Sequence, residues 1–440
     1  MPTNAELVLQ LFLQLAVILA ACRLGAWLLR PLGQPQVISE MVVGLVLGPS
    51  VLGMVAPSVQ RLLFPATLEM HGPDGSLMTL MHPSMSILYA FSQVGLVLYM
   101  FLIGLRLDLR LLGQHSRLAA SVSVAGIVTP LLLGGGLGLV LAGDKRLFGT
   151  HTSPAAAAIF VAAALSITAF PTLARIVHEH RLTGTRLGTL ALGAAAVDDA
   201  AAWSLLALVL AMSTGNLMIA VLALGGGVSY AAVVLIAGRP LLRHLDRQST
   251  GGAQAAREVF ALLLILLLLC AWFTDVTGIY AVFGAFLAGA ALPRGKLAAD
   301  AIQAIEPLTV TLLVPIFFVY AGLSSRLDLL LAPSMLGLTL LVIVIAFAAK
   351  GLACGLASRQ AGASWREASA LGILMNARGL MELVLITIGL ERGLITPALY
   401  TILLLMAVVT TVVTTPLFHA VWQASPRTPA TPVPVVLRPE

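Results

Sequence analysis

Apolar segments long enough to cross a bilayer recur along almost the whole of this 440-residue chain. Hydrophobic residues make up 59% of it and charged residues only 10%, far below the roughly 25% charged content of soluble domains. The segments are continuous rather than alternating, which indicates membrane-spanning helices and not a membrane β-barrel. The predicted fold class is therefore an all-α polytopic membrane protein with about thirteen crossings.

The predicted crossings cover 6–30, 36–55, 84–105, 118–142, 154–177, 187–212, 215–237, 257–274, 277–292, 307–323, 331–357, 366–391 and 396–423. The short segment 277–292 leaves twelve or fourteen crossings open. With the N-terminus outside, most of the 25 lysines and arginines fall in the inner loops and tail, as the positive-inside rule requires. An odd number of crossings then places the C-terminus in the cytoplasm.

A short internal repeat indicates two halves of opposite orientation. GLRLDL (104–109) and GLSSRLDL (322–329) each follow the third helix of a six-helix run, and the predicted topology puts them on opposite sides of the membrane. Inverted repeats are typical of secondary transporters, whose sites lie where interrupted helices meet. The expected division is a transmembrane domain 1–424, with a first repeat 6–212, a linker helix and loop 213–256 and a second repeat 257–424, followed by a disordered cytoplasmic tail 425–440.

Two adjacent aspartates, Asp198 and Asp199, lie in the middle of the apolar segment 187–212. Inserting each charge there into a membrane costs about 2.5 to 3.5 kcal/mol of free energy, so the pair is expected to serve a function or to have a structural partner. Neighbouring helical residues point about 100° apart, so one carboxylate can face a partner helix while the other faces a water-filled cavity. That arrangement suits a site where a cation and a proton compete. The alternative is a buried pair, neutralised by a basic residue, that only locks helices together.

Lys350 is a candidate partner, because no other charged residue lies between Leu331 and Ser358. A buried ammonium needs an anion, and pairing with Asp198 would make Lys350 either a proton carrier or a structural latch. The alternative is that Lys350 snorkels toward the membrane interface. The sequence leaves the choice between carrier and latch open.

Two further segments contain helix-breaking patterns. Pro171 lacks an N–H and its ring clashes with the carbonyl of Ile167, so segment 154–177 should unwind there. Carbonyls freed near Ser166 and Thr168 would be hard oxygen ligands for an alkali cation.

The matching segment of the second half, 366–391, is interrupted by Asn376, Arg378 and Gly379. Arg378 and Glu382 are four residues apart and can pair on one helix face, so we expect a structural role for them. If this segment and segment 154–177 cross, their opposed half-helix ends would balance the aspartate charges.

These residues together resemble the monovalent cation:proton antiporter-2 family, which includes bacterial sodium/proton and potassium/proton exchangers and plant cation/proton exchangers. The motifs occur in the order QPQVISEMVVGLVLGPSVLG, SITAFPTLARI, VDD, PIFFVYAGL, the lysine at 350 and NARGLMELVL. The resemblance implies a thirteen-helix homodimer with a dimerisation domain and a mobile core domain that works by elevator-type alternating access. It also implies that Asp199 is the essential ion-binding carboxylate, that Asp198 pairs with Lys350, and that Ser166 and Thr168 lie in the unwound stretch.

The Asp–Asp pair with a lysine resembles electrogenic antiporters, whereas electroneutral relatives tend to have Asn before the Asp. We therefore predict an electrogenic antiporter of the cell (inner) membrane that exchanges a monovalent cation for protons. Na⁺ is favoured over K⁺ or Li⁺, and the transported cation is the only metal expected. The runner-up is a channel-type potassium efflux pathway, which lacks support from a TVGYG-like filter. No HExxH or GxSxG motif is present, so neither an enzyme nor a cofactor is expected, and the net charge of +6 follows from the inner loops rather than from a nucleic-acid partner.

Overall fold

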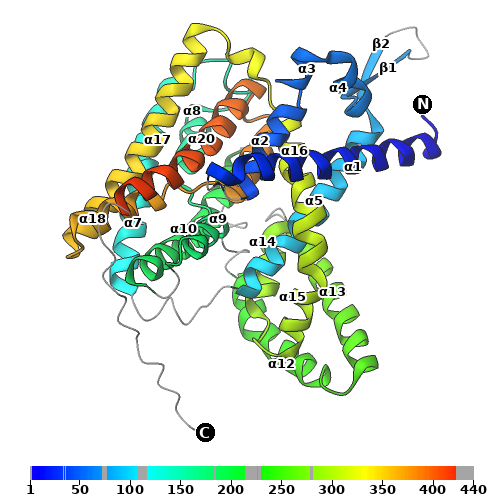
Figure 1. The fold of residues 1–440 in the computed structure, drawn as a ribbon, viewed down its shortest axis with the longest axis vertical. Coiled ribbons are helices and arrows are strands. Elements are labelled where there is room, and N and C mark those ends of the chain that lie inside the picture. Colours follow the sequence, from blue (N-terminus) through cyan, green and yellow to red (C-terminus); the bar gives the residue numbers. More distant parts are fainter. Residues whose placement is uncertain are drawn as a thin grey trace.

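The computed structural model describes residues 2–32, 34, 36–71, 77–106, 116–182, 185–213, 225, 229–277 and 281–422. It is an assembly of helices with one short hairpin (Figure 1), so the predicted all-α membrane fold is confirmed. Within the described residues, eight continuous helical runs are long and apolar enough to cross a membrane. Each of the eight overlaps a predicted segment.

The helices form two bodies, and each body takes three crossings from each predicted half. The first body contains α1 (Asn4–Leu29), α2 (Gln36–Leu47), α5 (Pro83–Arg106), α13 (Ala253–Val276), α14 (Ala281–Ala291) and the run of α15 (Lys296–Leu308), η3 (Thr309–Leu313) and α16 (Val314–Leu323). In this body α5 packs against α14 and α16, and α2 packs against α16. Its shorter connecting elements are η1 (Arg30–Leu32), α3 (Leu52–Val55), α4 (Pro57–Leu63), η2 (Val234–Gly238), α12 (Arg239–Gln248) and η4 (Leu327–Leu330).

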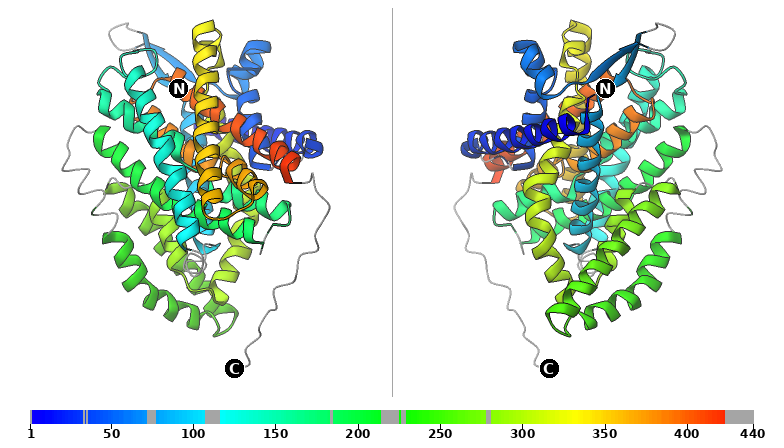
Figure 2. Two further views of the ribbon diagram at one scale, coloured as in Figure 1. Left: turned by 90° about the vertical axis from the view of Figure 1, so that its left-hand side faces the viewer. Right: turned by 90° about the vertical axis from the view of Figure 1, so that its right-hand side faces the viewer.

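The second body contains the helices that carry the predicted site residues. Its members are α7 (Ser116–Leu141), α8 (Pro154–Ser166), α9 (Phe170–Glu179), α10 (Arg186–Ser213), α17 (Pro333–Gln360), α18 (Trp365–Leu374), α19 (Leu380–Glu391) and α20 (Pro397–Trp422). Here α7 packs against α8, α10 and α17, while α18 packs between α17 and α20. Figure 1 shows α7, α17 and α18 on the left, apart from α12, α13 and α15 on the right, and Figure 2 gives two side views of the same arrangement.

Both predicted helix interruptions are present. The first lies between the end of α8 at Ser166 and the start of α9 at Phe170, and the second lies between α18 and α19. The two unwound stretches meet, because the backbone N–H of Ala169 donates a hydrogen bond to the carbonyl of Ala377 at 3.0 Å. The crossing therefore brings together segments that are more than two hundred positions apart in the chain.

Some predicted boundaries and loops differ from the structure. The segment predicted to begin at 307 begins at Lys296, because the charged residues Lys296, Asp300 and Glu306 hide its first turns from a hydropathy argument. The predicted loop between the second and third crossings contains α4 and an antiparallel hairpin of β1 (Thr67–His71) and β2 (Leu77–Met81), while α3 lies at the end of the predicted second crossing.

Two predicted segments lie mostly or wholly outside the described residues. Segment 215–237 lies mostly outside the described residues, and the tail 425–440 lies wholly outside them. The count of thirteen crossings, the inverted repeat, the domain boundaries and the orientation stay predictions.

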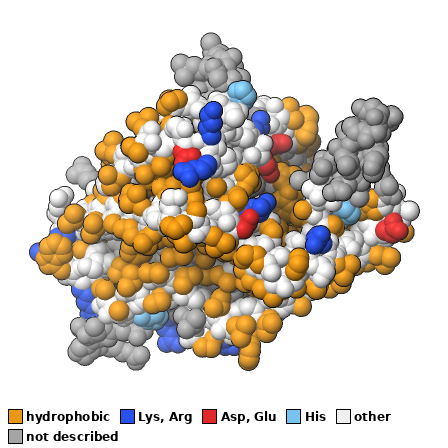
Figure 3. All heavy atoms as spheres, turned by 90° about the horizontal axis from the view of Figure 1, so that it is seen from above, with side chains coloured by type: hydrophobic (Ala, Val, Ile, Leu, Met, Phe, Trp, Pro, Cys, Tyr) orange, Lys and Arg blue, Asp and Glu red, His pale blue; other side chains and the backbone are white. Residues whose placement is uncertain are grey.

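Hydrophobic side chains cover large parts of the surface (Figure 3). Leu9, Trp27, Leu132 and Leu340 each expose more than half of their surface. Contiguous apolar area of this kind marks a surface that contacts something other than water, and in a chain of membrane-spanning helices the natural contact is lipid.

Glycine allows close packing where α2 and α16 cross. A Cβ atom at Gly322 would meet the backbone of Gly44 and Leu45, and one at Gly44 would meet the carbonyl of Phe318. Backbone atoms cannot move aside as a flexible side chain can, so this crossing requires residues without side chains.

We predict that Gly322→Ala lowers the thermal stability of the purified protein in detergent, since overpacking a tight contact costs about 1 to 3 kcal/mol. Gly337→Ala is the matched control, because a Cβ there meets no atom within 4 Å and alanine has the higher helix propensity. Equal melting temperatures for the two variants would contradict the packing argument.

Candidate functional site

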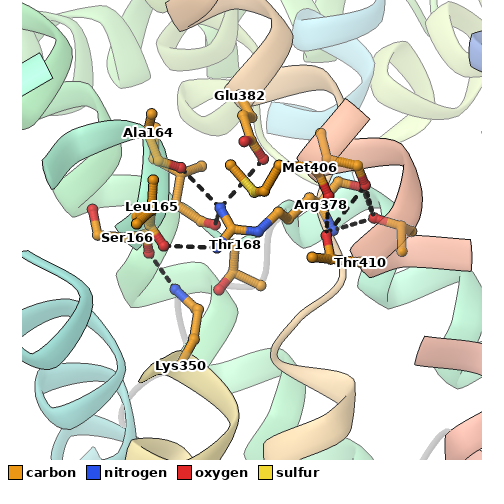
Figure 4. Close-up of polar contacts among 12 residues, drawn as sticks. Ala164, Leu165, Ser166, Thr168, Lys350, Arg378, Glu382, Met406 and Thr410 are labelled. Carbon is orange, nitrogen blue, oxygen red and sulfur yellow. Dashed lines mark hydrogen bonds and ion pairs between the residues drawn. The ribbon is translucent and has the colours of Figure 1, made fainter. Parts of the chain in front are cut away.

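The candidate site is built around the end of α8, which lies inside the protein. The last carbonyls of a helix have no partner within the helix, and buried carbonyls without partners are costly. Arg378 supplies bonds to three of them (Figure 4). Its Nη1 donates to the carbonyls of Ala164 at 2.8 Å and Ile167 at 3.4 Å, and its Nη2 donates to that of Leu165 at 2.7 Å.

Lys350 supplies the next bond. Its Nζ, carried by α17, donates to the carbonyl of Ser166, and the lysine side chain is fully buried. The same ammonium lies 2.9 Å from Oδ2 of Asp198, which is also fully buried. The two cations thus sit at the negative end of the α8 dipole, where positive charge is stabilised.

Asp198 is held by three donors from three different parts of the chain. Its Oδ2 accepts from Lys350 and from the hydroxyl of Thr168 at 2.7 Å, and its Oδ1 accepts from the hydroxyl of Ser123 at 2.5 Å. The Thr168 hydroxyl also lies 3.2 Å from the carbonyl of Met375. The unwound stretch after α8 is therefore joined both to the carboxylate and to the end of α18.

A second buried ion pair lies beside the first. Arg378 Nη1 is 3.3 Å from Oε2 of Glu382, and both side chains are fully buried. The backbone N–H of Arg378 donates to the hydroxyl of Thr411 on α20 at 2.9 Å. Asn376 donates from Nδ2 to the carbonyl of Gly372 at 2.9 Å, so it satisfies the end of α18. Arg378 thus bonds across the crossing to the end of α8, Glu382 compensates its charge, and Asn376 bonds within its own segment.

The structure describes the remaining predicted site residues only in part. Asp199 follows Asp198 in α10, and its side chain lies outside the described residues. The hydroxyl of Ser166 donates to the carbonyl of Ala163 at 3.0 Å, and that of Thr168 contacts Asp198. The part these residues take in binding a cation stays a prediction. Among the side chains that the structure describes, no group of three or more His, Cys, Asp or Glu residues is placed to hold a metal ion.

Sequence reasoning did not find Ser123 or Thr411. Serine and threonine are common in membrane helices, where their hydroxyls usually bond to the carbonyl four residues earlier, so nothing in the sequence distinguishes these two. His180, which directly follows α9, lies 2.8 Å from His419 of α20, nitrogen to nitrogen, while the side chain of His178 lies outside the described residues.

Two arginines each pair with a carboxylate, and the structure predicts that removing them lowers the free energy of unfolding by unequal amounts. Arg378→Leu leaves Glu382 buried and unpaired and the α8 carbonyls without donors, which should cost about 3 to 5 kcal/mol. Arg326→Ala removes an exposed pair with Asp328, worth less than about 1 kcal/mol. Arg326 holds the pKa of the Asp328 carboxyl below its ordinary value, so this small contribution is present at neutral pH and is lost as the pH falls through the lowered pKa.

Thermal melting of the purified variants in detergent measures the difference. The double variant Arg378→Leu/Glu382→Leu should recover part of the loss, because it leaves no buried charge without a partner. If Arg378→Leu and Arg326→Ala melted at the same temperature, the capping role of Arg378 would be refuted.

Comparisons with known proteins identify the family of the chain. The family described as "Sodium/hydrogen exchanger, transmembrane" matches residues 16–424. The chain is 36% identical to the Na(+)/H(+) antiporter NhaS4 of Synechocystis sp. (strain ATCC 27184 / PCC 6803 / Kazusa), over 96% of this chain and 99% of that protein. It is 34% identical to cation/H(+) antiporter 18 of Arabidopsis thaliana, over 94% of this chain but only 49% of the plant protein.

The fold is also found among solved structures. The sodium proton antiporter MjNhaP1 from Methanocaldococcus jannaschii, at pH 8, superposes with a TM-score of 0.60 over 95% of this chain and 97% of that one, at 16% sequence identity. The predicted resemblance to cation:proton antiporters is confirmed by the sequence relatives, and the fold by this structure. The chain belongs to the sodium/hydrogen exchanger family.

Proposed function

We propose that this protein is a secondary antiporter that exchanges a monovalent cation, with Na⁺ favoured, for protons across a cell membrane. The observation that carries the proposal is the buried ion pair of Asp198 and Lys350 at the broken end of α8, next in sequence to a second aspartate. The printed names of the relatives, a Na(+)/H(+) antiporter and a cation/H(+) antiporter, support the same reaction class.

Competition for one carboxylate explains how the two flows are coupled. A buried carboxylate is costly unless a positive charge compensates it, and in the proposal Asp199 is compensated either by the transported cation or by a proton. Because each occupant excludes the other, movement of one across the membrane requires return of the other. Carbonyl and hydroxyl oxygens of the unwound stretch at Ser166 and Thr168 would complete the coordination of the cation.

The contact between the two bodies is compatible with their relative movement. Three hydroxyls on α20 bond within their own helix: Thr410 to the carbonyl of Met406, and Thr414 to that of Thr410, both at 2.8 Å, and Thr411 to that of Ala407. The hydroxyls of these side chains therefore have hydrogen-bond acceptors within α20 and need none from the first body. Hydrogen bonds that do cross between the bodies include Gln34 Nε2 to the carbonyl of Val412 at 3.0 Å. We infer that the second body, which carries the site, moves against the first as in an elevator.

The proposal predicts that Asp199→Asn abolishes exchange. The assay is dissipation of an imposed pH gradient in proteoliposomes containing a pH-sensitive dye, with Na⁺, K⁺ and Li⁺ added in turn. The dye response of the variant should fall to that of protein-free liposomes for every cation, because a neutral amide has no charge to compensate and does not exchange a cation for a proton. Asp328→Asn is the control, since Asp328 is an exposed carboxylate paired with Arg326.

Two outcomes would overturn the proposal. Exchange that persists in Asp199→Asn would remove the carboxylate from the mechanism. A cation flux in the wild type that ignores the pH gradient would favour a potassium efflux pathway of channel type.

We further propose that exchange is electrogenic and that the Asp198–Lys350 pair moves the additional charge. Lys350→Met alone leaves Asp198 buried without its cation and should destabilise the protein, whereas Asp198→Asn/Lys350→Met removes both charges. We predict that the double variant still exchanges Na⁺ for protons, while its rate no longer responds to a membrane potential imposed with valinomycin and a potassium gradient. Voltage dependence as strong as that of the wild type would restrict Lys350 to the role of a structural latch.

A further inference from the structure

An apolar groove, the α17–α18 groove, lies between these two helices of the second body. It has a volume of about 360 Å³, which is within the range of ligand-binding pockets. Gly351, Gly355 and the bulkier Phe347 are among the residues that line it. All but one of the described lining residues are apolar, and the exception is Ser369. The groove therefore suits a hydrocarbon ligand.

The α17–α18 groove opens onto a surface that faces lipid. Leu352, Leu356 and Trp365 line it, and each exposes half of its surface or more. In Figure 1, α17 and α18 lie on the left, on the far side of the second body from α13 and α15. From Phe347 to Leu356 the groove follows α17 for about 14 Å at 1.5 Å per residue, half of a hydrocarbon core that is roughly 30 Å thick. Its length matches one acyl chain of a single leaflet.

Two tryptophans that stack with arginines mark the level at which the groove ends. The guanidinium of Arg359, in the last turn of α17, lies 5.3 Å from the ring centre of Trp365, the first residue of α18. The guanidinium of Arg366 lies 4.9 Å from the ring centre of Trp422, the last residue of α20. Tryptophan is concentrated at membrane–water interfaces, so this end of the groove lies at the level of the lipid headgroups.

The two arginines differ in what they can bind. Arg366 donates to the carbonyls of Val421 and Trp422, so it satisfies the end of α20. Arg359 is exposed, and its Nη1 donates to the carbonyl of Ala363 at 2.8 Å. Because a guanidinium has five N–H donors in a planar fork, Arg359 can bind a phosphate oxygen while keeping this bond. A basic side chain at headgroup level, next to a groove for an acyl chain, fits an anionic phospholipid.

We propose that the α17–α18 groove binds one anionic membrane phospholipid, with an acyl chain in the groove and the phosphate on Arg359. The chain lies directly behind the ion pair of the site, because Gly351 follows Lys350 in α17 and a Cβ at Gly351 would be 2.9 Å from Nδ2 of Asn376. A ligand that binds only the folded protein stabilises it, so the lipid stabilises the packing of α17 against α18. This inference does not depend on which ion the protein exchanges.

Native mass spectrometry of the purified protein in detergent tests the proposal with two lipids that have the same acyl chains. Phosphatidylglycerol should bind at lower concentration than phosphatidylcholine and should raise the melting temperature further. Arg359→Gln should weaken phosphatidylglycerol binding about fivefold, the ratio that corresponds to about 1 kcal/mol for one basic side chain at an anionic membrane surface. The same variant should leave phosphatidylcholine binding unchanged.

Ala348→Phe tests whether the chain occupies the groove, and Gly337→Phe is the matched control. Ala348 lines the groove, so a phenyl ring there takes the space of the acyl chain and should abolish the rise in melting temperature caused by phosphatidylglycerol. Gly337 is exposed on the same helix, and a Cβ there meets no atom within 4 Å, so the rise should persist. If Ala348→Phe fails to fold, Ser369→Phe, on α18, replaces it with the same expected result.

Three results would overturn the proposal. Equal affinity of the wild type for the two lipids would exclude recognition of an anionic headgroup. A rise in melting temperature that survives in folded Ala348→Phe or Ser369→Phe would place the lipid elsewhere. Loss of a dimer in Ala348→Phe, with lipid binding unchanged, would assign the groove to contact with a second copy of the chain. Each of these results leaves the proposed antiport function standing.

Discussion

The end of α8 inside the second body is the constraint on which the rest of the site depends. A helix that ends within a membrane protein presents carbonyls that neither water nor the next turn satisfies. Here two cations from the other half of the chain satisfy them: Arg378 bonds to the carbonyls of Ala164, Leu165 and Ile167, and Lys350 bonds to that of Ser166.

Each of these cations in turn requires an anion, because a buried charge without a partner is strongly destabilising. Arg378 pairs with Glu382, and Lys350 pairs with Asp198. The break in one helix thus accounts for four charged side chains. It also explains why α17 and α19, which come late in the sequence, must pack against α8 and α10 for the chain to fold.

The sequence was sufficient to predict those residues of the site whose presence in an apolar helix is energetically unfavourable. Charges at Asp198, Lys350 and Arg378 and the proline at 171 are all unfavourable in an apolar helix, so each stands out and calls for a partner or a break. The same reasoning failed for Ser123, because a serine in a membrane helix costs little and ordinarily bonds to its own backbone. It also failed for the first turns of α15, where Lys296 and Glu306 made a helix look like a loop. A hydropathy argument identifies residues that are energetically unfavourable in a membrane helix. It misses residues such as Ser123, whose contacts depend on which helix lies opposite.

The charge balance of the crossing supports the role proposed for the second aspartate, Asp199. Lys350 and Arg378 are compensated by Asp198 and Glu382, and the partial negative charge at the end of α8 is taken up by the same two cations. The starts of α9 and α19 add partial positive charge at the crossing, which is about half an elementary charge for each helix end. Each end alone favours an anion nearby without neutralising a whole carboxylate. In the proposed exchange, a site of this kind would attract a mobile positive charge without holding it permanently, as a carrier that both binds and releases its cation requires.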